Sequence, residues 1–131
     1  SITSFCYATI PVALGMHDEV ESMRQIFAKR AALMYKLIQE WPDVECAEPT
    51  GAFYAFPRIV NYFGKTSPAG TTVTDAVNFT KSLLDETSVA VVPGTDFGGC
   101  GPDHIRLSFA CSEDQITKGV TMIGEWLSKF S

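Results

Sequence analysis

A glycine-rich loop followed by an arginine is the part of the sequence best suited to chemistry. Residues 93–102 contain glycines at positions 94, 98, 99 and 101, and residues 104–110 carry Arg106. Glycine lacks a β-carbon and tolerates positive φ, so such a loop lets the backbone approach a small ligand closely. An arginine on a rigid strand presents a planar fork of N–H donors that matches the two oxygens of a carboxylate. This stretch therefore indicates recognition of a small carboxylate ligand by Arg106.

Residue types alone leave two interpretations of Arg106 open. The side chain could bind a ligand carboxylate, or it could pair with a structural carboxylate such as Asp96 or Asp103. His104 lies two residues away on the same face of an extended segment, and we expect it to have a structural role rather than to contact an anion. Four aromatic side chains could line a pocket, although we expect them to pack in the core: Phe53, Tyr54, Phe56 and Phe97.

Other site chemistries find little support. The loop matches neither G-x-x-x-x-G-K-[ST] nor G-x-G-x-x-G, the two nucleotide-binding fingerprints. The four cysteines form no C-x-x-C pair and neither histidine stands at ligand spacing from a second ligand, so we expect no metal site. A Cys111 nucleophile with His104 as its base is disfavoured, because their spacing corresponds to about 23 Å along an extended strand.

Composition and charge describe one acidic domain. The chain has 131 residues, of which 46% are apolar, and this length can bury a core without disulfide or metal staples. A net charge of -5 disfavours binding to nucleic acid or anionic lipid. No apolar run approaches the roughly 18 residues that span a bilayer, and the first residues lack the basic start of a signal peptide. We therefore expect a cytoplasmic protein with reduced thiols that binds neither nucleic acid nor membrane.

Hydrophobic periodicity predicts the elements that precede the loop. Apolar residues recur at three- and four-residue intervals from Asp18 to about Trp41, which indicates a long amphipathic helix ended by Pro42. A strand is predicted over residues 52–56. A second helix is predicted over about residues 73–86, with a hydroxyl cap from Thr72 or Thr74 and an apolar face of Val77, Phe79, Leu83 and Leu84. The apolar run at residues 89–92 suits a strand covered on both faces.

The last third of the chain has the clearest local signals. Ile105, Leu107 and Phe109 alternate with polar residues, so one face of this strand is buried and the other carries Arg106. Ser112 and Gln115 form a capping box that starts a final helix. Its buried stripe is predicted to contain Ile116, Val120, Ile123, Trp126, Leu127 and Phe130. The order of elements predicts an α+β domain, with a small, mostly antiparallel sheet of three to four strands packed against helices.

Three short segments resemble a known family. They are GAFYAFP at residues 51–57, VAVVPGTDFG at residues 89–98 and HIRLSFA at residues 104–110. In this order they resemble the C-terminal small domain of the fold-type I pyridoxal-phosphate-dependent aminotransferases, the aspartate aminotransferase class. The resemblance covers about Asp18 to the end of the chain. Before it, Thr3-Ser4-Phe5 fits the family pattern but Pro11 interrupts it, so we expect residues 1–16 to be an extension from a large domain.

The resemblance implies roles for individual residues. The family's arginine that binds the substrate α-carboxylate maps onto Arg106, and a phenylalanine near the bound substrate maps onto Phe97. The implied reaction moves an amino group from an amino acid to a 2-oxo acid through pyridoxal 5'-phosphate held by a lysine. That lysine and the other cofactor-binding and catalytic residues belong to the large domain of the family, and none is recognisable in this chain. Full-length relatives are implied to be homodimers.

The sequence therefore predicts that residues 1–131 are the C-terminal small domain of an aminotransferase of amino acid metabolism, inactive without the large domain. Two alternatives remain. The chain could be a stand-alone regulatory domain that binds a carboxylate through Arg106 without catalysis. It could also be an oligomerisation module in which exposed Trp126 and Phe130 face a partner.

Overall fold

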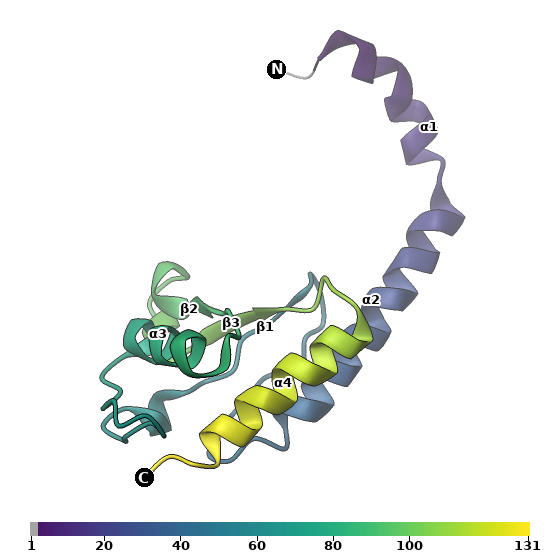
Figure 1. The fold of residues 1–131 in the computed structure, drawn as a ribbon. Helices are drawn as coiled ribbons and strands as arrows, with labels where there is room; N and C mark the ends of the chain where they lie inside the picture. Colours follow the sequence, from purple (N-terminus) through teal and green to yellow (C-terminus); the bar gives the residue numbers. More distant parts are fainter. Residues whose placement is uncertain (1–2) are drawn as a thin grey trace.

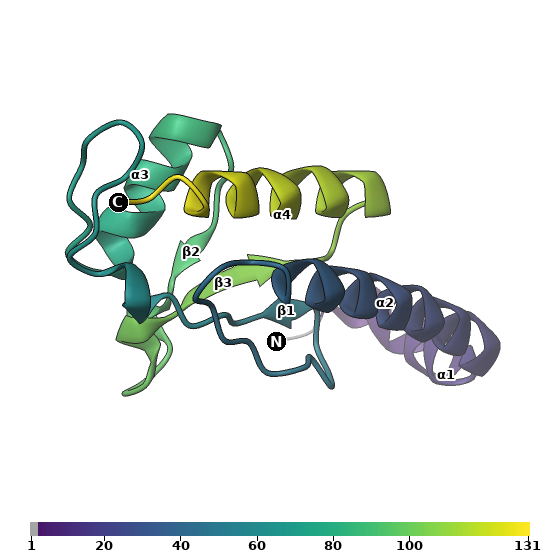
Figure 2. The same cartoon turned by 90° about the horizontal axis from the view of Figure 1, so that it is seen from below.

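The computed structural model describes residues 3–131 as an α+β domain with a three-stranded antiparallel sheet, which confirms the predicted fold class. The strands β1 (Tyr54–Ala55), β2 (Val92–Pro93) and β3 (Ile105–Ser108) have the order β1-β3-β2. The helices α2 (His17–Ile38), α3 (Ala76–Thr87) and α4 (Glu113–Leu127) share one hydrophobic core with the sheet. Figure 2 shows β3 between its two neighbours, with α4 lying across the sheet.

The central strand β3 has one buried face and one open face, as the alternation predicted. Ile105, Leu107 and Phe109 are buried in the core. Tyr54 of β1 pairs with Ser108, and Val92 of β2 pairs with Arg106. Because side chains alternate along a strand, Arg106 and Ser108 lie on the opposite face to the core. This open face is where the candidate site lies.

The outer strands are shorter than predicted. Only Tyr54–Ala55 of the predicted strand at residues 52–56 pairs with β3, and the run at residues 89–92 contributes only Val92 to β2. The prediction that this run is covered on both faces is wrong. Val92 is exposed, whereas Val89 and Val91 are partly buried against the core, so only one face of the run is covered.

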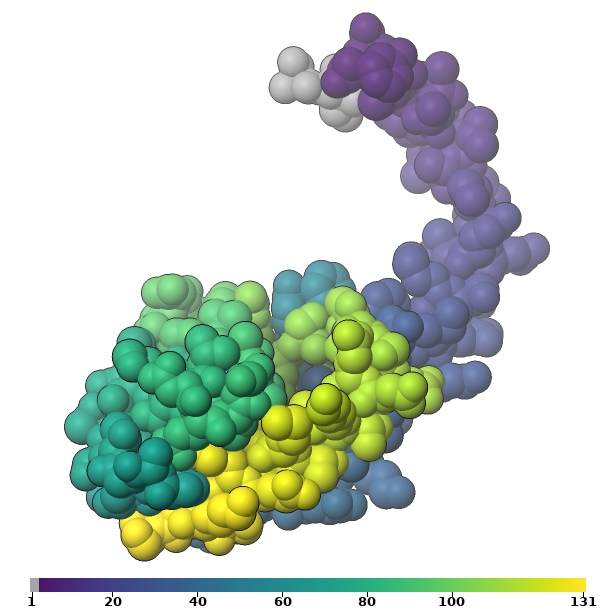
Figure 3. Space-filling view, in the orientation of Figure 1, coloured from purple at the N-terminus to yellow at the C-terminus, as the bar shows by residue number. Residues whose placement is uncertain are grey.

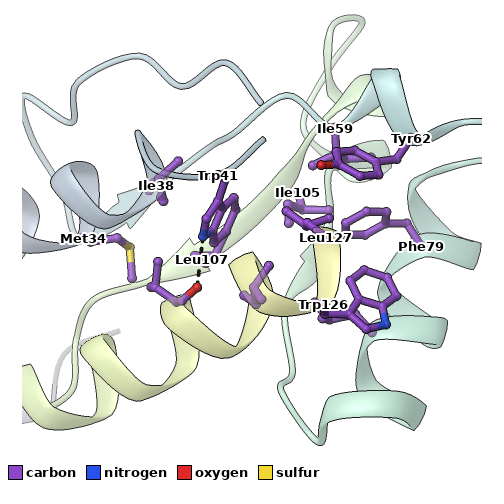
Figure 4. Close-up of a cluster of buried hydrophobic side chains, with 14 of the residues drawn as sticks. Met34, Ile38, Trp41, Ile59, Tyr62, Phe79, Ile105, Leu107, Trp126 and Leu127 are labelled. Carbon is purple, nitrogen blue, oxygen red and sulfur yellow. Dashed lines mark hydrogen bonds between the residues drawn. The ribbon is translucent and has the colours of Figure 1, made fainter. Parts of the chain in front are cut away.

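The long helix α2 is packed along only half of its length. Met34 and Ile38 are buried, whereas Val20 and Met23, which share the predicted apolar stripe, are 54% and 53% exposed. The helix ends before Trp41, whose buried indole donates a hydrogen bond of 3.0 Å to the Val120 carbonyl of α4 (Figure 4). The hydrophobic periodicity therefore predicted the helix correctly, but it does not show which of its turns pack against the rest of the domain.

The chain before the packed half of α2 forms an extended arm, defined here as residues 3–26. It consists of the 3₁₀ helix η1 (Ser4–Thr9), the short helix α1 (Ile10–Leu14) and the first turns of α2. Figures 1 and 3 show it projecting away from the rest of the domain. Its exposed apolar side chains include Phe5, Tyr7, Val12, Leu14, Val20, Met23 and Ile26.

Helix α3 begins later than predicted and has a different cap. Its N-cap is Asp75, whose carboxylate accepts a 2.8 Å hydrogen bond from the Asn78 backbone N–H, so the predicted hydroxyl cap is wrong. A carboxylate at this position also interacts favourably with the positive end of the helix dipole. Phe79 and Leu83 are buried as predicted, but Val77 and Leu84 are exposed.

Helix α4 follows the prediction closely. The Ser112–Gln115 capping box is present, and its buried residues are Ile116, Val120, Ile123, Trp126 and Leu127. Phe130 lies just beyond the helix and packs edge-on against Trp126, with ring centroids 4.6 Å apart. The expectation that Trp126 and Phe130 form an exposed docking surface is therefore wrong, because both belong to the core or pack against it. Within residues 3–131 no helix is long and apolar enough to cross a membrane.

Candidate carboxylate-binding site

The Arg106 guanidinium lies over two aromatic rings on the open face of the sheet. Its central carbon is 4.4 Å from the ring centroid of Tyr54 and 4.5 Å from that of Phe97. Both distances are well inside the range of cation–π attraction, about 6 Å. The arginine itself is partly buried.

The two rings reach Arg106 from the two flanking strands. Tyr54 on β1 pairs with Ser108, two residues from Arg106 on β3, so Tyr54 and Arg106 are diagonal neighbours. Diagonal neighbours on adjacent strands lie about 7–8 Å apart, which is within reach of aromatic and long side chains. Phe97 directly follows the 3₁₀ turn η3 (Gly94–Asp96), which continues from β2. Since β3 lies between β1 and β2, its arginine has one ring on each side.

The structure shows that neither Asp96 nor Asp103 pairs with Arg106. Asp103 lies 3.4 Å from the guanidinium of Arg58, which also approaches Glu45 at 3.7 Å. Across residues 3–131, Arg106 forms no ion pair with Asp96, Asp103 or any other acid. Within residues 3–131, the predicted alternative pairing of Arg106 with Asp96 or Asp103 is therefore not present, and Asp103 pairs with Arg58 instead.

The glycine-rich loop brings backbone close to backbone. The turn η3 packs against a second turn, η4 (Gly101–Asp103), and the Gly94 N–H donates a 2.8 Å hydrogen bond to the His104 carbonyl. A β-carbon on Gly94 would lie 2.6 Å from that same carbonyl oxygen and still closer to the one of Gly101. These two glycines therefore hold the loop that carries Phe97 against the start of β3.

His104 has the structural role that was expected of it. Its ring stacks on Phe56 with a centroid distance of 4.8 Å and an interplanar angle of 5°. Its Nδ1 lies 2.8 Å from the carbonyl oxygen of Cys100, which closes the turn before β3. Phe56 in turn meets Phe97 edge-on at 6.0 Å. Phe97 therefore contacts both the Arg106 guanidinium and the ring of Phe56, which stacks on His104.

The prediction that the four aromatic residues pack in the core is wrong. Phe53 and Phe97 are each 40% exposed, and Tyr54 and Phe56 are only partly buried. The sequence named Tyr54 only as one of four residues that could line a pocket, and its contact with Arg106 was not predicted. The signal that could have found it is the strand register, because Tyr54 opposite Ser108 shares a face with Arg106. The register between β1 and β3 cannot be deduced from the spacing of residues within one strand.

The lysines of this chain lie outside the three strands of the sheet that carries Arg106. Lys65 lies 3.1 Å from Asp43 and over the Tyr62 ring, and Lys81 lies 2.7 Å from Asp85 on α3. The others are exposed on α2, on α4 or just after α4: Lys29, Lys36, Lys118 and Lys129. Within residues 3–131 there is also no cluster of three or more histidine, cysteine or acidic residues that could hold a metal ion.

Comparison with known proteins identifies the family to which this chain is similar. Residues 5–123 match the family model described as aminotransferase class I and II. The chain is 35% identical over 127 residues to an asparagine–oxo-acid transaminase of Streptococcus mutans, covering 97% of this chain and 30% of that protein. It is 38% identical over 121 residues to an aspartate aminotransferase of Geobacillus stearothermophilus, covering 92% and 29%.

A solved structure has a similar fold over most of this chain. The crystal structure of the aspartate aminotransferase from Rhizobium meliloti superposes with a TM-score of 0.81 at 29% identity, covering 87% of this chain and 28% of that one. The chain thus spans about 30% of the length of the curated relatives that it matches. With the family model matching most of its residues, the chain belongs to the class I and II aminotransferases.

Proposed function

We propose that the chain is the C-terminal small domain of a pyridoxal-phosphate-dependent aminotransferase, and that Arg106 binds the α-carboxylate of its amino acid and 2-oxo acid substrates. The observation that carries the proposal is an arginine on a rigid strand, packed by two rings and free of acidic partners within residues 3–131. Family membership supplies the context, since the relatives are aminotransferases.

The proposed role of Arg106 is to bind and orient. A guanidinium can donate two parallel hydrogen bonds to a carboxylate, and such charge-assisted bonds are about twice as strong as neutral ones. The partly buried position of Arg106 lowers the competition from water for the bound oxygens. Since the family resemblance places the cofactor lysine in the large domain, we assign the chemistry of amino-group transfer to the rest of the polypeptide, and to this chain only the carboxylate contact.

The test is the variant Arg106→Ala in the full-length enzyme. Loss of the cation is expected to cost about 2–5 kcal/mol, which is about 30-fold to several-thousand-fold in kcat/KM for both the amino acid and the 2-oxo acid. Arg106→Lys keeps the charge without the planar fork and should recover only part of this loss. Steady-state kinetics identical to wild type in Arg106→Ala would exclude the proposal.

We also propose that the arm packs against the large domain of the same polypeptide. The arm exposes a series of apolar side chains on a unit with little packing of its own, and large exposed apolar patches mark interaction surfaces. Relatives of more than three times this length have the additional chain to cover it. A homodimer and a cytoplasmic location remain predictions.

Limited proteolysis tests the arm's partner. Trypsin should cleave after Arg24 rapidly in the isolated chain and much more slowly in the full-length protein, even when the latter is diluted to a monomer. Equal rates in the two proteins would exclude packing of the arm. Protection that disappears on dilution would assign the arm to a second subunit instead.

A further inference from the structure

We infer that Tyr54 is a positioning residue for substrate binding, because its ring holds the Arg106 guanidinium in the orientation that presents its N–H fork to a carboxylate. The inference rests on the proposed function of Arg106. It goes further by assigning a role to a β1 residue that is neither in the core nor positively charged.

The first step of the argument is the kind of contact that the ring makes. A guanidinium is planar, and its donors point outward in that plane. A ring that covers the face of the group attracts the cation without using any of its N–H donors. An acid at the same place would take up N–H donors, as Asp103 does with one nitrogen of Arg58. Tyr54 therefore fixes Arg106 and leaves it competent for a ligand.

The second step is that the ring, and not the hydroxyl, makes the contact. The Tyr54 ring centroid lies 4.4 Å from the guanidinium carbon. Tyr62, by contrast, uses its hydroxyl as a donor to the Pro42 carbonyl, and no such bond involves the Tyr54 hydroxyl within residues 3–131. Phenylalanine should therefore replace Tyr54 without loss, whereas an aliphatic side chain should not.

The third step separates Tyr54 from Phe97. Phe97 sits on the loop after η3 and is 40% exposed, so it depends on the loop's own conformation. Tyr54 sits on a strand whose next residue, Ala55, is buried in the core. Because rigid elements position a binding group better than loops do, Tyr54 is the contact that restricts Arg106 before the ligand arrives. Restriction before binding reduces the conformational entropy lost on binding.

This reasoning predicts a specific kinetic pattern. A ring that improves carboxylate binding equally in the ground state and the transition state changes KM and leaves kcat unchanged. The experiment uses the full-length enzyme in four forms besides wild type: Tyr54→Phe, Tyr54→Leu, Arg106→Ala and the double variant Tyr54→Leu/Arg106→Ala. KM and kcat are measured for the amino acid that the wild type uses best, and Tyr54→Ile replaces Tyr54→Leu if the latter does not fold.

The expected result is a KM raised about fivefold to tenfold in Tyr54→Leu with kcat within about twofold of wild type, the size of a partly exposed cation–π contact. Tyr54→Phe should match wild type. In the Arg106→Ala background, Tyr54→Leu should have no further effect, because Tyr54 acts through the arginine.

Three outcomes would overturn the inference while leaving the proposed function intact: a Tyr54→Leu variant with wild-type KM beside an impaired Arg106→Ala variant, a Tyr54→Phe variant as impaired as Tyr54→Leu, or an additional loss in the double variant. An Arg106→Ala variant with wild-type kinetics would overturn the proposed function itself.

Discussion

Gly94 and Gly101 approach each other so closely that a β-carbon on either would overlap the carbonyl oxygen of the other. The contact joins the turns η3 and η4 on either side of the loop that carries Phe97. No rotation of a side chain can relieve such an overlap, because both partners are backbone. The glycine requirement at these two positions therefore comes from packing within the loop.

We predict that Gly101→Ala lowers the free energy of unfolding of the domain by about 1–3 kcal/mol, the usual cost of overpacking. Urea denaturation measures it. Gly99→Ala is the matched control in the same loop, because its β-carbon would meet nothing within 4 Å, and it should change stability by less than about 0.5 kcal/mol. Equal effects of the two substitutions would contradict the packing argument.

Two glycines of helix α4 should respond to alanine in opposite directions. A β-carbon on Gly124 would lie 2.9 Å from Cδ1 of the Trp41 indole, a rigid ring that is also hydrogen-bonded to Val120. A β-carbon on Gly119 would lie 4.0 Å from Val89, an ordinary contact. Gly119→Ala should therefore raise stability by about 0.5–1 kcal/mol through helix propensity. Gly124→Ala should lower it by about 1 kcal/mol or more, since overpacking exceeds that gain.

Thermal unfolding of the two variants side by side checks this prediction. Because they share a helix and a substitution, their intrinsic helix propensity terms are the same. Midpoints that both rise would show that the indole of Trp41 moves aside at little cost.

Removal of the α3 cap is the third prediction. Asp75→Ala should cost about 1 kcal/mol of stability, while Asp75→Asn, which can accept the same bond from the Asn78 N–H, should retain most of it. Thr72→Ala is the control, since Asp75 is the residue that caps this helix. If Thr72→Ala proved the more damaging change, the assignment of the cap would be wrong.

The same residue gives a pH dependence. The hydrogen bond from the Asn78 backbone holds the pKa of the Asp75 carboxyl below its ordinary value of 3.8. The contribution of the charged cap is therefore present above that value and is lost as the pH falls through the lower pKa of the folded state. Denaturation of wild type and Asp75→Asn between pH 2 and pH 6 should give curves that converge at the acidic end.

Tyr62 provides a prediction at the opposite end of the pH scale. Burial, with a smaller contribution from the negative charge of Asp43, raises the pKa of Tyr62 to about 12. A raised pKa means that the neutral phenol stabilises the fold fully below pH 10, and that this stability is lost as the pH rises from 10 towards 12. Urea denaturation at pH 9, 10 and 11 should show this loss in wild type and a shallower one in Tyr62→Phe.

Other groups titrate in the same range, so the comparison needs a second variant. Tyr7→Phe on the exposed arm should keep the wild-type pH dependence. Tyr62→Phe should also be less stable at neutral pH by about 1 kcal/mol, because its hydroxyl donates to the Pro42 carbonyl. A wild-type slope in Tyr62→Phe would contradict the assignment.

The parts of the fold that were predicted correctly rest on local signals. Two of these signals each lie within a few residues of sequence. The capping box at Ser112 and Gln115 specifies the start of a helix, and the alternation around Arg106 specifies a strand with one buried face. The prediction of the α3 cap was wrong. The predicted caps were Thr72 and Thr74, but the helix begins after Asp75, whose carboxylate accepts the bond from the Asn78 N–H.

The parts that could not be predicted depend on pairing between distant segments. Periodicity gives α2 an apolar stripe, but only the turns that face α4 are buried. The position of Arg106 on an open face follows from alternation alone. Its contact with Tyr54 does not, because it requires the register between β1 and β3, residues more than 50 positions apart in the chain. That Asp103 pairs with Arg58 and not with Arg106 also could not be predicted, because Arg58 reaches Asp103 from another segment.

The hydrogen bond from Trp41 to Val120 spans 79 positions in the chain, and the packing of α2 on α4 around it has a consequence for synthesis. Met34, Ile38 and Trp41 leave the ribosome long before α4 does. At about 5–20 residues per second, these side chains stay without their partner for roughly 4–16 s. Contacts of such long range also slow folding once the chain is complete. During that period the apolar side chains of Met34, Ile38 and Trp41 lack the helix that buries them, and transiently exposed apolar surface of this kind favours aggregation.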